Sequence, residues 1–187
     1  MKGQIFIITG PSGVGKTEIS KKILANQKLN TKKVITCTTR PKRDGEIDGK
    51  DYFFLSREEF EENLKNNKMF EFATVYGNYY GSRKEDVERI LYEGTNVLFV
   101  IDVQGAVNMK IIDPDCRVIF IQAESLEELK VRLFSRKSDN EEVIGQRLST
   151  ALKEMESAKE FDFTVTNLHD KLGEAVREVE KIISAKV

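Results

Sequence analysis

Residues 5–17 read IFIITGPSGVGKT, an apolar run followed at once by a glycine-rich loop. The run Ile5–Thr9 consists of β-branched and aromatic residues and predicts a buried strand. The next eight residues, from Gly10 to Thr17, match the pattern G-x-x-x-x-G-K-[ST]. The apolar residues that follow have helical spacing, which predicts a helix beginning near Lys16. A strand, a glycine-rich loop and a helix in this order predict a phosphate-binding loop.

The chemistry of such a loop follows from its backbone. Successive N–H groups point inward, and the helix N-terminus adds a partial positive charge, so the loop binds phosphate oxygens. We expect Lys16 to neutralise charge on the β and γ phosphates of ATP, and the Thr17 hydroxyl to hold Mg²⁺. A chance match to the four fixed positions would occur in on the order of one chain in a hundred. The expected ATP contacts in the loop are Gly10, Pro11, Ser12, Gly13, Val14, Gly15, Lys16 and Thr17.

The rest of the chain alternates between strand and helix signals, which is typical of an α/β protein with a parallel sheet core flanked by helices. Further buried strands are predicted at Val34–Thr36, Val97–Asp102, Val118–Gln122 and Phe163–Thr166. Helical stripes run from Ile19 to Leu24, Val87 to Leu91, Ile144 to Ala158 and Leu172 to Ile183.

Asp102 ends one of these predicted strands. A carboxylate at the carboxyl end of a buried parallel strand faces the crevice where ligands of such sheets bind. It could act there on Mg²⁺ or on the phosphate acceptor. The alternative is a plain structural role as a helix cap.

Composition limits the class of protein. The chain has 187 residues, 40% apolar and 33% charged, which predicts one folded domain. A net charge of -1 provides no global attraction for nucleic acid, so an anionic ligand needs a local cluster of cations. The two cysteines lack zinc or redox spacing, and no stretch approaches the roughly 20 apolar residues of a membrane helix. We therefore expect a cytoplasmic protein that binds neither nucleic acid nor membrane, as a monomer or homodimer.

Residues 36–46 read TCTTRPKRDGE and concentrate cations beside hydroxyl groups. Arg40 and Arg43 offer planar guanidinium groups that match phosphate oxygens bidentately. The hydroxyls of Tyr52 and Tyr80 could complete a phosphate cage. The sequence therefore predicts a second phosphate site, separate from the loop.

The segment 38–82 breaks the strand and helix alternation. It is rich in Gly, Asp, Tyr and Phe, with a short helical stretch at Glu58–Leu64. This pattern predicts a small inserted unit that is rich in β structure. A second, strongly polar stretch at 135–146 lies between two amphipathic helices and suits a surface segment.

At these residues the sequence resembles the guanylate kinase family. The matching motifs are GPSGVGKT at 10–17, TTRPKRDGEIDGKDYFF at 38–54, Phe70–Glu71, GNYYGS at 77–82 and IDVQGA at 101–106. The resemblance covers essentially the whole chain and implies a P-loop kinase fold in a single domain, 1–187. It divides that domain into a core (1–35, 83–124 and 160–187), a GMP-binding insertion (36–82) and a helical lid (125–159).

The resemblance also implies roles for single residues. The phosphate of GMP would be bound by Arg40, Arg43, Tyr52 and Tyr80. Guanine would be recognised by Thr36, Glu71 and Ser82, with Asp102 also contacting GMP. Lid arginines would close over the transferring phosphate at Arg132, Arg136 and Arg147, and Asn167 would lie near the ATP base. The expected catalytic residues are Lys16, Arg40, Asp102, Arg136 and Arg147.

The chemistry of guanine agrees with this assignment. Guanine presents two adjacent donors, N1–H and the exocyclic amino group, so the Glu71 carboxylate can accept from both. Adenine places an acceptor at N1, and the site would reject AMP. One departure from the family lies nearby: relatives usually have an acidic residue two positions before Asp102, where this chain has Val100. That change removes a polar group close to the expected GMP pocket.

We therefore expect Mg²⁺-dependent transfer of the γ-phosphate of ATP to GMP, and to dGMP, in purine nucleotide metabolism. Two alternatives remain. A guanylate-kinase-like binding module with weak catalysis would typically have a degraded phosphate-binding loop, which is intact here. A related kinase acting on a sugar phosphate would have no use for Glu71 and the guanine-reading hydroxyls.

Overall fold

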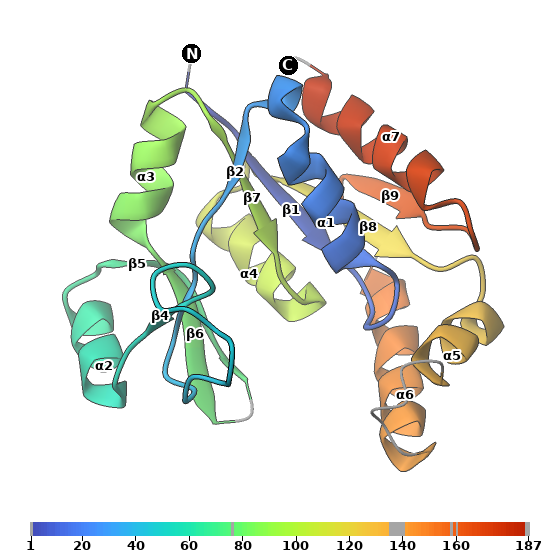
Figure 1. The fold of residues 1–187 in the computed structure, drawn as a ribbon, viewed down its shortest axis with the longest axis horizontal. Coiled ribbons are helices and arrows are strands. Elements are labelled where there is room, and N and C mark those ends of the chain that lie inside the picture. Colours follow the sequence, from blue (N-terminus) through green and yellow to red (C-terminus); the bar gives the residue numbers. More distant parts are fainter. Residues whose placement is uncertain (1, 76, 135–140, 158, 160, 186–187) are drawn as a thin grey trace.

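A computed structural model describes residues 2–75, 77–134, 141–157, 159 and 161–185. A sheet of five parallel strands runs through its centre in the order β2-β7-β1-β8-β9 (Figure 1). The α/β class with a parallel core is confirmed. Across the described ranges, no helix is both long and apolar enough to cross a membrane. The strands are β1 (Ile5–Thr9), β2 (Thr31–Lys33), β7 (Asn96–Val100), β8 (Arg117–Gln122) and β9 (Phe163–Thr166).

Helices cover both faces of this sheet, as the apolar strands require (Figure 1). Side chains of β1 alternate between the faces: Phe6 and Ile8 pack in one cluster with helices α1 and α7, and Ile5 and Ile7 in another with α3 and α4. All four side chains are nearly or fully buried. The helices are α1 (Lys16–Ala25), α3 (Lys84–Tyr92), α4 (Val103–Ile112) and α7 (Leu172–Ser184).

The glycine-rich loop leaves the carboxyl end of β1, which lies between β7 and β8 in the sheet. After β1 the chain first builds strands on one side and then on the other, so this position is the switch point where ligands of open α/β sheets bind. Gly10, Gly13 and Gly15 all have positive φ, at 132°, 91° and 95°. The loop therefore needs glycine at these positions.

A second, four-stranded sheet, here called the small sheet, lies beside the carboxyl end of the main sheet, with strand order β4-β3-β6-β5 (Figure 1). Helix α2 (Arg57–Lys65) starts with a capping box between Ser56 and Glu59 and packs on it through the fully buried Phe60. The strands are β3 (Cys37–Thr38), β4 (Phe53–Phe54), β5 (Met69–Val75) and β6 (Asn78–Arg83). A short 3-10 helix, η1 (Gln27–Leu29), and the helices α5 (Leu126–Phe134) and α6 (Glu141–Ser157) complete the described elements.

A β-bulge in β5 decides which way Glu71 faces. Met69 pairs with Arg83, but Glu71 pairs with Ser82, so one extra residue lies between them on β5. Without the bulge, Met69 and Glu71 would share a face, because strand side chains alternate. Instead Met69 packs with Phe60 under α2, and Glu71 faces the opposite side with Ser82.

The predicted strand at Val34–Thr36 is wrong. The strand in this region is β2, at Thr31–Lys33, and Val34 is buried where the chain crosses from the main sheet to the small sheet. β2 escaped notice because it is an edge strand that pairs only with β7, and its lysines face solvent.

The strand predicted at Val97–Asp102 also ends early, at Val100, because Asp102 caps helix α4. The sequence did not predict α4, because its apolar residues do not follow the helical spacing of an amphipathic helix. Its apolar residues lie on all sides, so Met109 is buried while Ile111 remains 76% exposed.

Replacing Gly10 tests the close packing of the loop against β8. A Cβ at Gly10 would lie 2.1 Å from the carbonyl oxygen of Ile121, at a φ of 132°. We expect Gly10→Ala to lower the free energy of unfolding by about 3 kcal/mol in chemical denaturation. Gly45→Ala is the matched control, since φ is 83° there but nothing lies within 4 Å of the new Cβ. An equal loss of unfolding free energy in the two variants would mean that the clash of the new Cβ with the carbonyl oxygen of Ile121 contributes nothing.

Candidate active site

Lys16 lies against the glycine-rich loop. Its Nζ donates hydrogen bonds to the carbonyl oxygens of Gly10 and Pro11, the latter at 2.8 Å. The ammonium group is therefore held against the loop rather than extended into solvent. This arrangement places a full positive charge beside the loop backbone, which is favourable for binding phosphate.

Asn167 connects the loop to helix α5. Its side chain is 6% exposed, and Nδ2 donates to the carbonyl oxygen of Val14 at 2.9 Å. The carbonyl oxygen of Asn167 accepts from Arg132 Nη2 at 2.8 Å, and Arg132 Nε donates to Glu128 at 2.8 Å. Two partners thus fix the Arg132 side chain, whereas an arginine on a solvated helix face would be mobile. With Gly13, Gly15 and Leu168, Arg132 and Asn167 line a cavity of about 340 Å³ beside the loop.

A second cavity, of about 170 Å³, opens between the two sheets and is here called the inter-sheet cavity. It brings together residues that lie far apart in the sequence, from the small sheet and from the carboxyl end of β7. Val100, the position that departs from the family pattern, also lines it. The predicted acceptor-site residues that line it are Thr36, Tyr52, Glu71, Tyr80 and Asp102.

Glu71 is the most perturbed carboxylate of this cavity. Burial raises its pKa and the charge of Asp102 raises it further, while a hydrogen bond from Ser82 opposes them. The fully buried Ser82 hydroxyl donates to Glu71 Oε1 at 2.9 Å. Ser82 does not itself line the cavity, so it acts on it through Glu71. A partly buried carboxylate with a directed partner is a strong candidate for recognising hydrogen-bond donors.

Asp102 caps a helix and also lines the inter-sheet cavity. Its Oδ1 accepts from the N–H of Gly105 at 2.7 Å, and so caps helix α4. The residue also lines the inter-sheet cavity beside Glu71. The cap fixes the orientation of the carboxylate at the carboxyl end of the main sheet.

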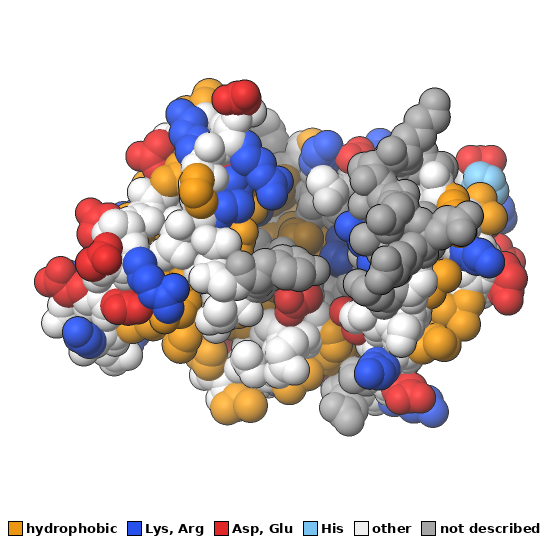
Figure 2. Space-filling view, turned by 90° about the horizontal axis from the view of Figure 1, so that it is seen from below, with side chains coloured by type: hydrophobic (Ala, Val, Ile, Leu, Met, Phe, Trp, Pro, Cys, Tyr) orange, Lys and Arg blue, Asp and Glu red, His pale blue; other side chains and the backbone are white. Residues whose placement is uncertain are grey.

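The two predicted phosphate-binding arginines of residues 36–46 differ in their surroundings. The Arg40 guanidinium carbon lies 5.6 Å from the centre of the Tyr52 ring. Arg40 therefore lies next to Tyr52 but does not itself line the inter-sheet cavity. Arg43 is exposed and is tied by its backbone N–H to Glu46. Figure 2 shows Lys and Arg side chains gathered on one rim of the hollowed face.

Of two predicted lid arginines, Arg136 and Arg147, only Arg147 lies in the described part of the chain. Arg136 lies outside the described residues. Arg147 is half-buried on α6 and lines neither of the two cavities.

Sequence reasoning missed Glu154, on helix α6. Burial raises its pKa, the charge of Lys16 lowers it, and the charge of Asp102 raises it. Glu154 therefore lies within electrostatic reach of the loop lysine and of the inter-sheet cavity. In the sequence it is one of many acidic residues on a charged helix, and only the packing of α6 distinguishes it.

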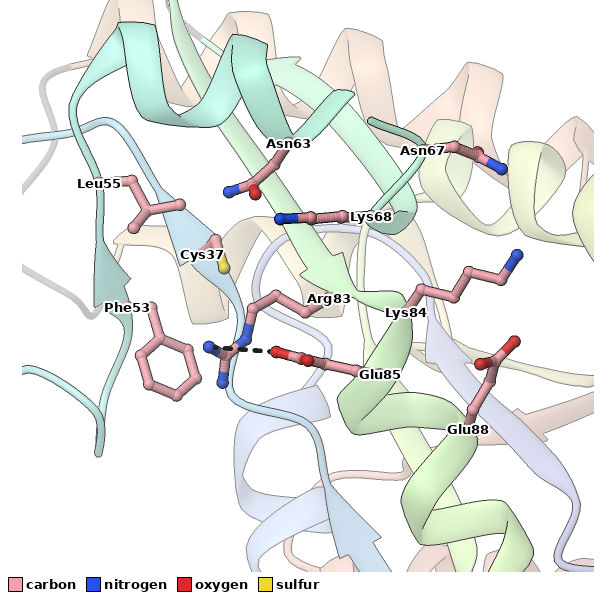
Figure 3. Close-up of a pocket in the computed structure, with 10 residues that line it drawn as sticks. All are labelled: Cys37, Phe53, Leu55, Asn63, Asn67, Lys68, Arg83, Lys84, Glu85 and Glu88. Carbon is pink, nitrogen blue, oxygen red and sulfur yellow. Dashed lines mark ion pairs between the residues drawn. The ribbon is translucent and has the colours of Figure 1, made fainter. Parts of the chain in front are cut away.

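A third cavity, of about 430 Å³, lies on the other face of the small sheet and contains none of the predicted site residues (Figure 3). Strand alternation explains this, since Cys37, Phe53 and Arg83 point away from the inter-sheet cavity. Arg83 stacks on the Phe53 ring at 3.8 Å and pairs with Asp86 at 2.7 Å. Burial raises the pKa of the Cys37 thiol to about 11, which disfavours the nucleophilic thiolate. These contacts join the small sheet to α3 and indicate a structural role.

Relatives of this chain match it along nearly its whole length. The guanylate kinase of Clostridium tetani is 42% identical over 185 residues, covering 99% of this chain and 87% of the relative. The guanylate kinase of Fusobacterium nucleatum is 43% identical over 165 residues, covering 88% of each. A crystal structure of guanylate kinase from Anaplasma phagocytophilum has a TM-score of 0.75 at 31% identity, covering 97% of this chain and 85% of that one.

The family model described as guanylate kinase matches residues 2–186, which is almost the entire chain. The motifs that this match spans include the phosphate-binding loop and the strands around the inter-sheet cavity. The chain belongs to the guanylate kinase family.

Proposed function

We propose that the phosphate-binding loop holds ATP and the inter-sheet cavity holds GMP, for the reaction of this family, the phosphorylation of GMP. The chain is a nucleotide kinase. The observation that carries the assignment of the two sites is the gathering of Thr36, Glu71 and Asp102 in one cavity at the edge where the loop leaves β1. Two substrates bound there would meet at the carboxyl end of the main sheet.

Recognition of the base rests on Glu71. Ionised, it accepts hydrogen bonds from N1–H and from the exocyclic amino group of guanine, which adenine cannot offer together. Ser82 fixes the carboxylate through its hydrogen bond to Oε1. The Thr36 hydroxyl lines the same cavity and is available to donate to guanine O6. Leaving such a buried group unpaired costs about 1–3 kcal/mol, so each contact contributes roughly tenfold to discrimination.

The phosphate of GMP lies on the side of Tyr52, Tyr80 and Arg40. It is already anionic near neutral pH, so attack on ATP needs no strong general base. Catalysis then consists of alignment and charge neutralisation. Arg40 and Arg43 hold the attacking phosphate in line, and Lys16 neutralises the transferring group. Asp102 orients the acceptor from the end of β7.

We propose that Thr17 helps to hold Mg²⁺ at the donor site. Mg²⁺ is usually bound through one or two protein groups together with substrate phosphates and water. Thr17 is exposed on the first turn of α1, next to Lys16. No group of three metal-ligating side chains gathers within the described part of the chain, which agrees with an ion held mainly by ATP. When bound, Mg²⁺ would neutralise charge on the β and γ phosphates.

We propose that two parts of the chain, the GMP-binding insertion and the lid, move relative to the core during the reaction. Residues 36–82 would carry GMP toward the core, and residues 125–159, with Arg147 and Arg136, would close over the transferring phosphate. Closure excludes water, which would otherwise compete as the acceptor. Arg132 joins this lid to the ATP site through its bond to Asn167.

We also propose that the protein is cytoplasmic. The two cysteines, which are both free and buried, support this proposal.

Acceptor selectivity tests the proposed substrate. A coupled assay of ADP release, with ATP and Mg²⁺, compares GMP, dGMP, AMP, UMP and ribose 5-phosphate. We expect turnover with GMP and dGMP at least about a hundredfold above the other acceptors. Turnover with AMP equal to that with GMP would contradict the role of the inter-sheet cavity. Preferential turnover with the sugar phosphate would support the alternative kinase.

A further inference from the structure

Glu46 joins the two arginines that follow the Thr38–Thr39 pair. Its Oε1 lies 2.7 Å from Arg40 Nη2, and its Oε2 accepts from the backbone N–H of Arg43 at 2.8 Å. Both carboxylate oxygens are therefore used, by two different residues of one turn. The side chains of Arg40 and Glu46 are 12% and 21% exposed.

This contact differs from the exposed ion pairs of the molecule. On helix α2, Arg57 and Glu61 also pair, at 3.0 Å, but their side chains are 57% and 41% exposed. Exposed pairs of that kind contribute little, because solvent screens them and both side chains remain mobile. The pair formed by Glu46 is shielded, and its second oxygen anchors the backbone at Arg43.

Arg40 is restrained on its other sides as well. Nη1 donates to the carbonyl oxygen of Pro41 at 2.6 Å. The guanidinium carbon lies 5.6 Å from the Tyr52 ring centre and 5.8 Å from that of Phe54. Held in this way, the guanidinium group has little rotamer freedom left to lose when it binds an anion.

We propose that Glu46 is a positioning residue, which fixes Arg40 and the turn at Arg43 so that they receive the phosphate of GMP. This inference rests on the proposed function of the inter-sheet cavity. Glu46 does not contact the base, because it lies outside the residues that line that cavity. Its effect is therefore directed at the phosphate end of the nucleotide.

The opposite role makes an opposite prediction. A carboxylate on Arg40 could occupy the place of the phosphate and compete with it. Removing such a competitor would lower the KM for GMP, whereas removing a positioning residue raises it. The sign of the change in KM therefore distinguishes the two roles.

The test uses Glu46→Gln, because an amide puts an NH₂ donor in place of one of the two oxygens that Arg40 and Arg43 now use separately. We expect the KM for GMP to rise about tenfold, with the KM for ATP changing less than about twofold. Direct binding is measured by calorimetry with GMP and with guanosine. The affinity for GMP should fall about tenfold and that for guanosine should not change, since guanosine has no phosphate.

Two further variants complete the experiment. Glu46→Asp keeps the charge and both oxygens, and should recover part of the lost GMP affinity; it also serves if Glu46→Gln does not fold. Glu61→Gln is the matched control in the same part of the chain, and should leave both affinities unchanged. An unchanged or lowered KM for GMP, or an equal loss of guanosine affinity, would overturn the positioning role. Failure of the unaltered protein to phosphorylate GMP would instead overturn the proposed function.

Discussion

Lys16→Ala should reduce phosphate transfer by at least about a thousandfold while the protein remains folded. Lys16 supplies the positive charge held against the loop carbonyls of Gly10 and Pro11. Removing it leaves charge on the transferring phosphate without its main protein counterion. The loop backbone depends on its glycines and on the bond from Asn167 to Val14, which the substitution leaves in place.

The measurement is the coupled ADP assay at saturating GMP, with a thermal unfolding curve for each protein. Lys22→Ala is the matched control, because Lys22 lies in the last turn of the same helix and is exposed. The control should retain turnover. If Lys16→Ala retained turnover within about tenfold of the unaltered protein, the role assigned to the loop would be wrong.

Strands buried on both faces were the part of the fold that the sequence predicted best. β1 has the predicted bounds, at Ile5–Thr9, and β8 begins only one residue before the predicted Val118. Such strands can be recognised without knowing their neighbours in the fold, because a strand that is buried on both faces must be a continuous run of apolar residues. β2 is the counterexample, since an edge strand bears polar residues and is set by pairing with β7.

The orientation of Glu71 shows where sequence reasoning ends. Motif spacing predicted the residue, but simple alternation would have placed it on the face of Met69, under α2. The bulge between Met69 and Glu71 reverses this, and it depends on the register with β6. Glu46 escaped for a related reason: it is an ordinary acidic residue in the sequence, and only its contacts with Arg40 and Arg43 in the fold distinguish it.

Glu71→Gln should lower kcat/KM for GMP by at least about a hundredfold, with a much smaller loss for other acceptors. Glutamine keeps the size of the side chain but replaces one acceptor with a donor, which opposes a donor of guanine. Inosine monophosphate lacks the exocyclic amino group of guanine, so it makes one hydrogen bond fewer to Glu71. The substitution should therefore reduce turnover less with this nucleotide than with GMP.

AMP gives the sharpest readout for Glu71, because adenine pairs an acceptor at N1 with a donor on its amino group. A glutamine amide can donate to adenine N1, where the Glu71 carboxylate would face a lone pair, so Glu71→Gln should raise the ratio of AMP to GMP turnover. Ser82→Ala is the companion variant: it leaves the carboxylate but removes its hydrogen bond at Oε1. It should weaken GMP turnover without favouring AMP. An equal loss with every acceptor in Glu71→Gln would show that the residue supports the fold of the small sheet and does not read the base.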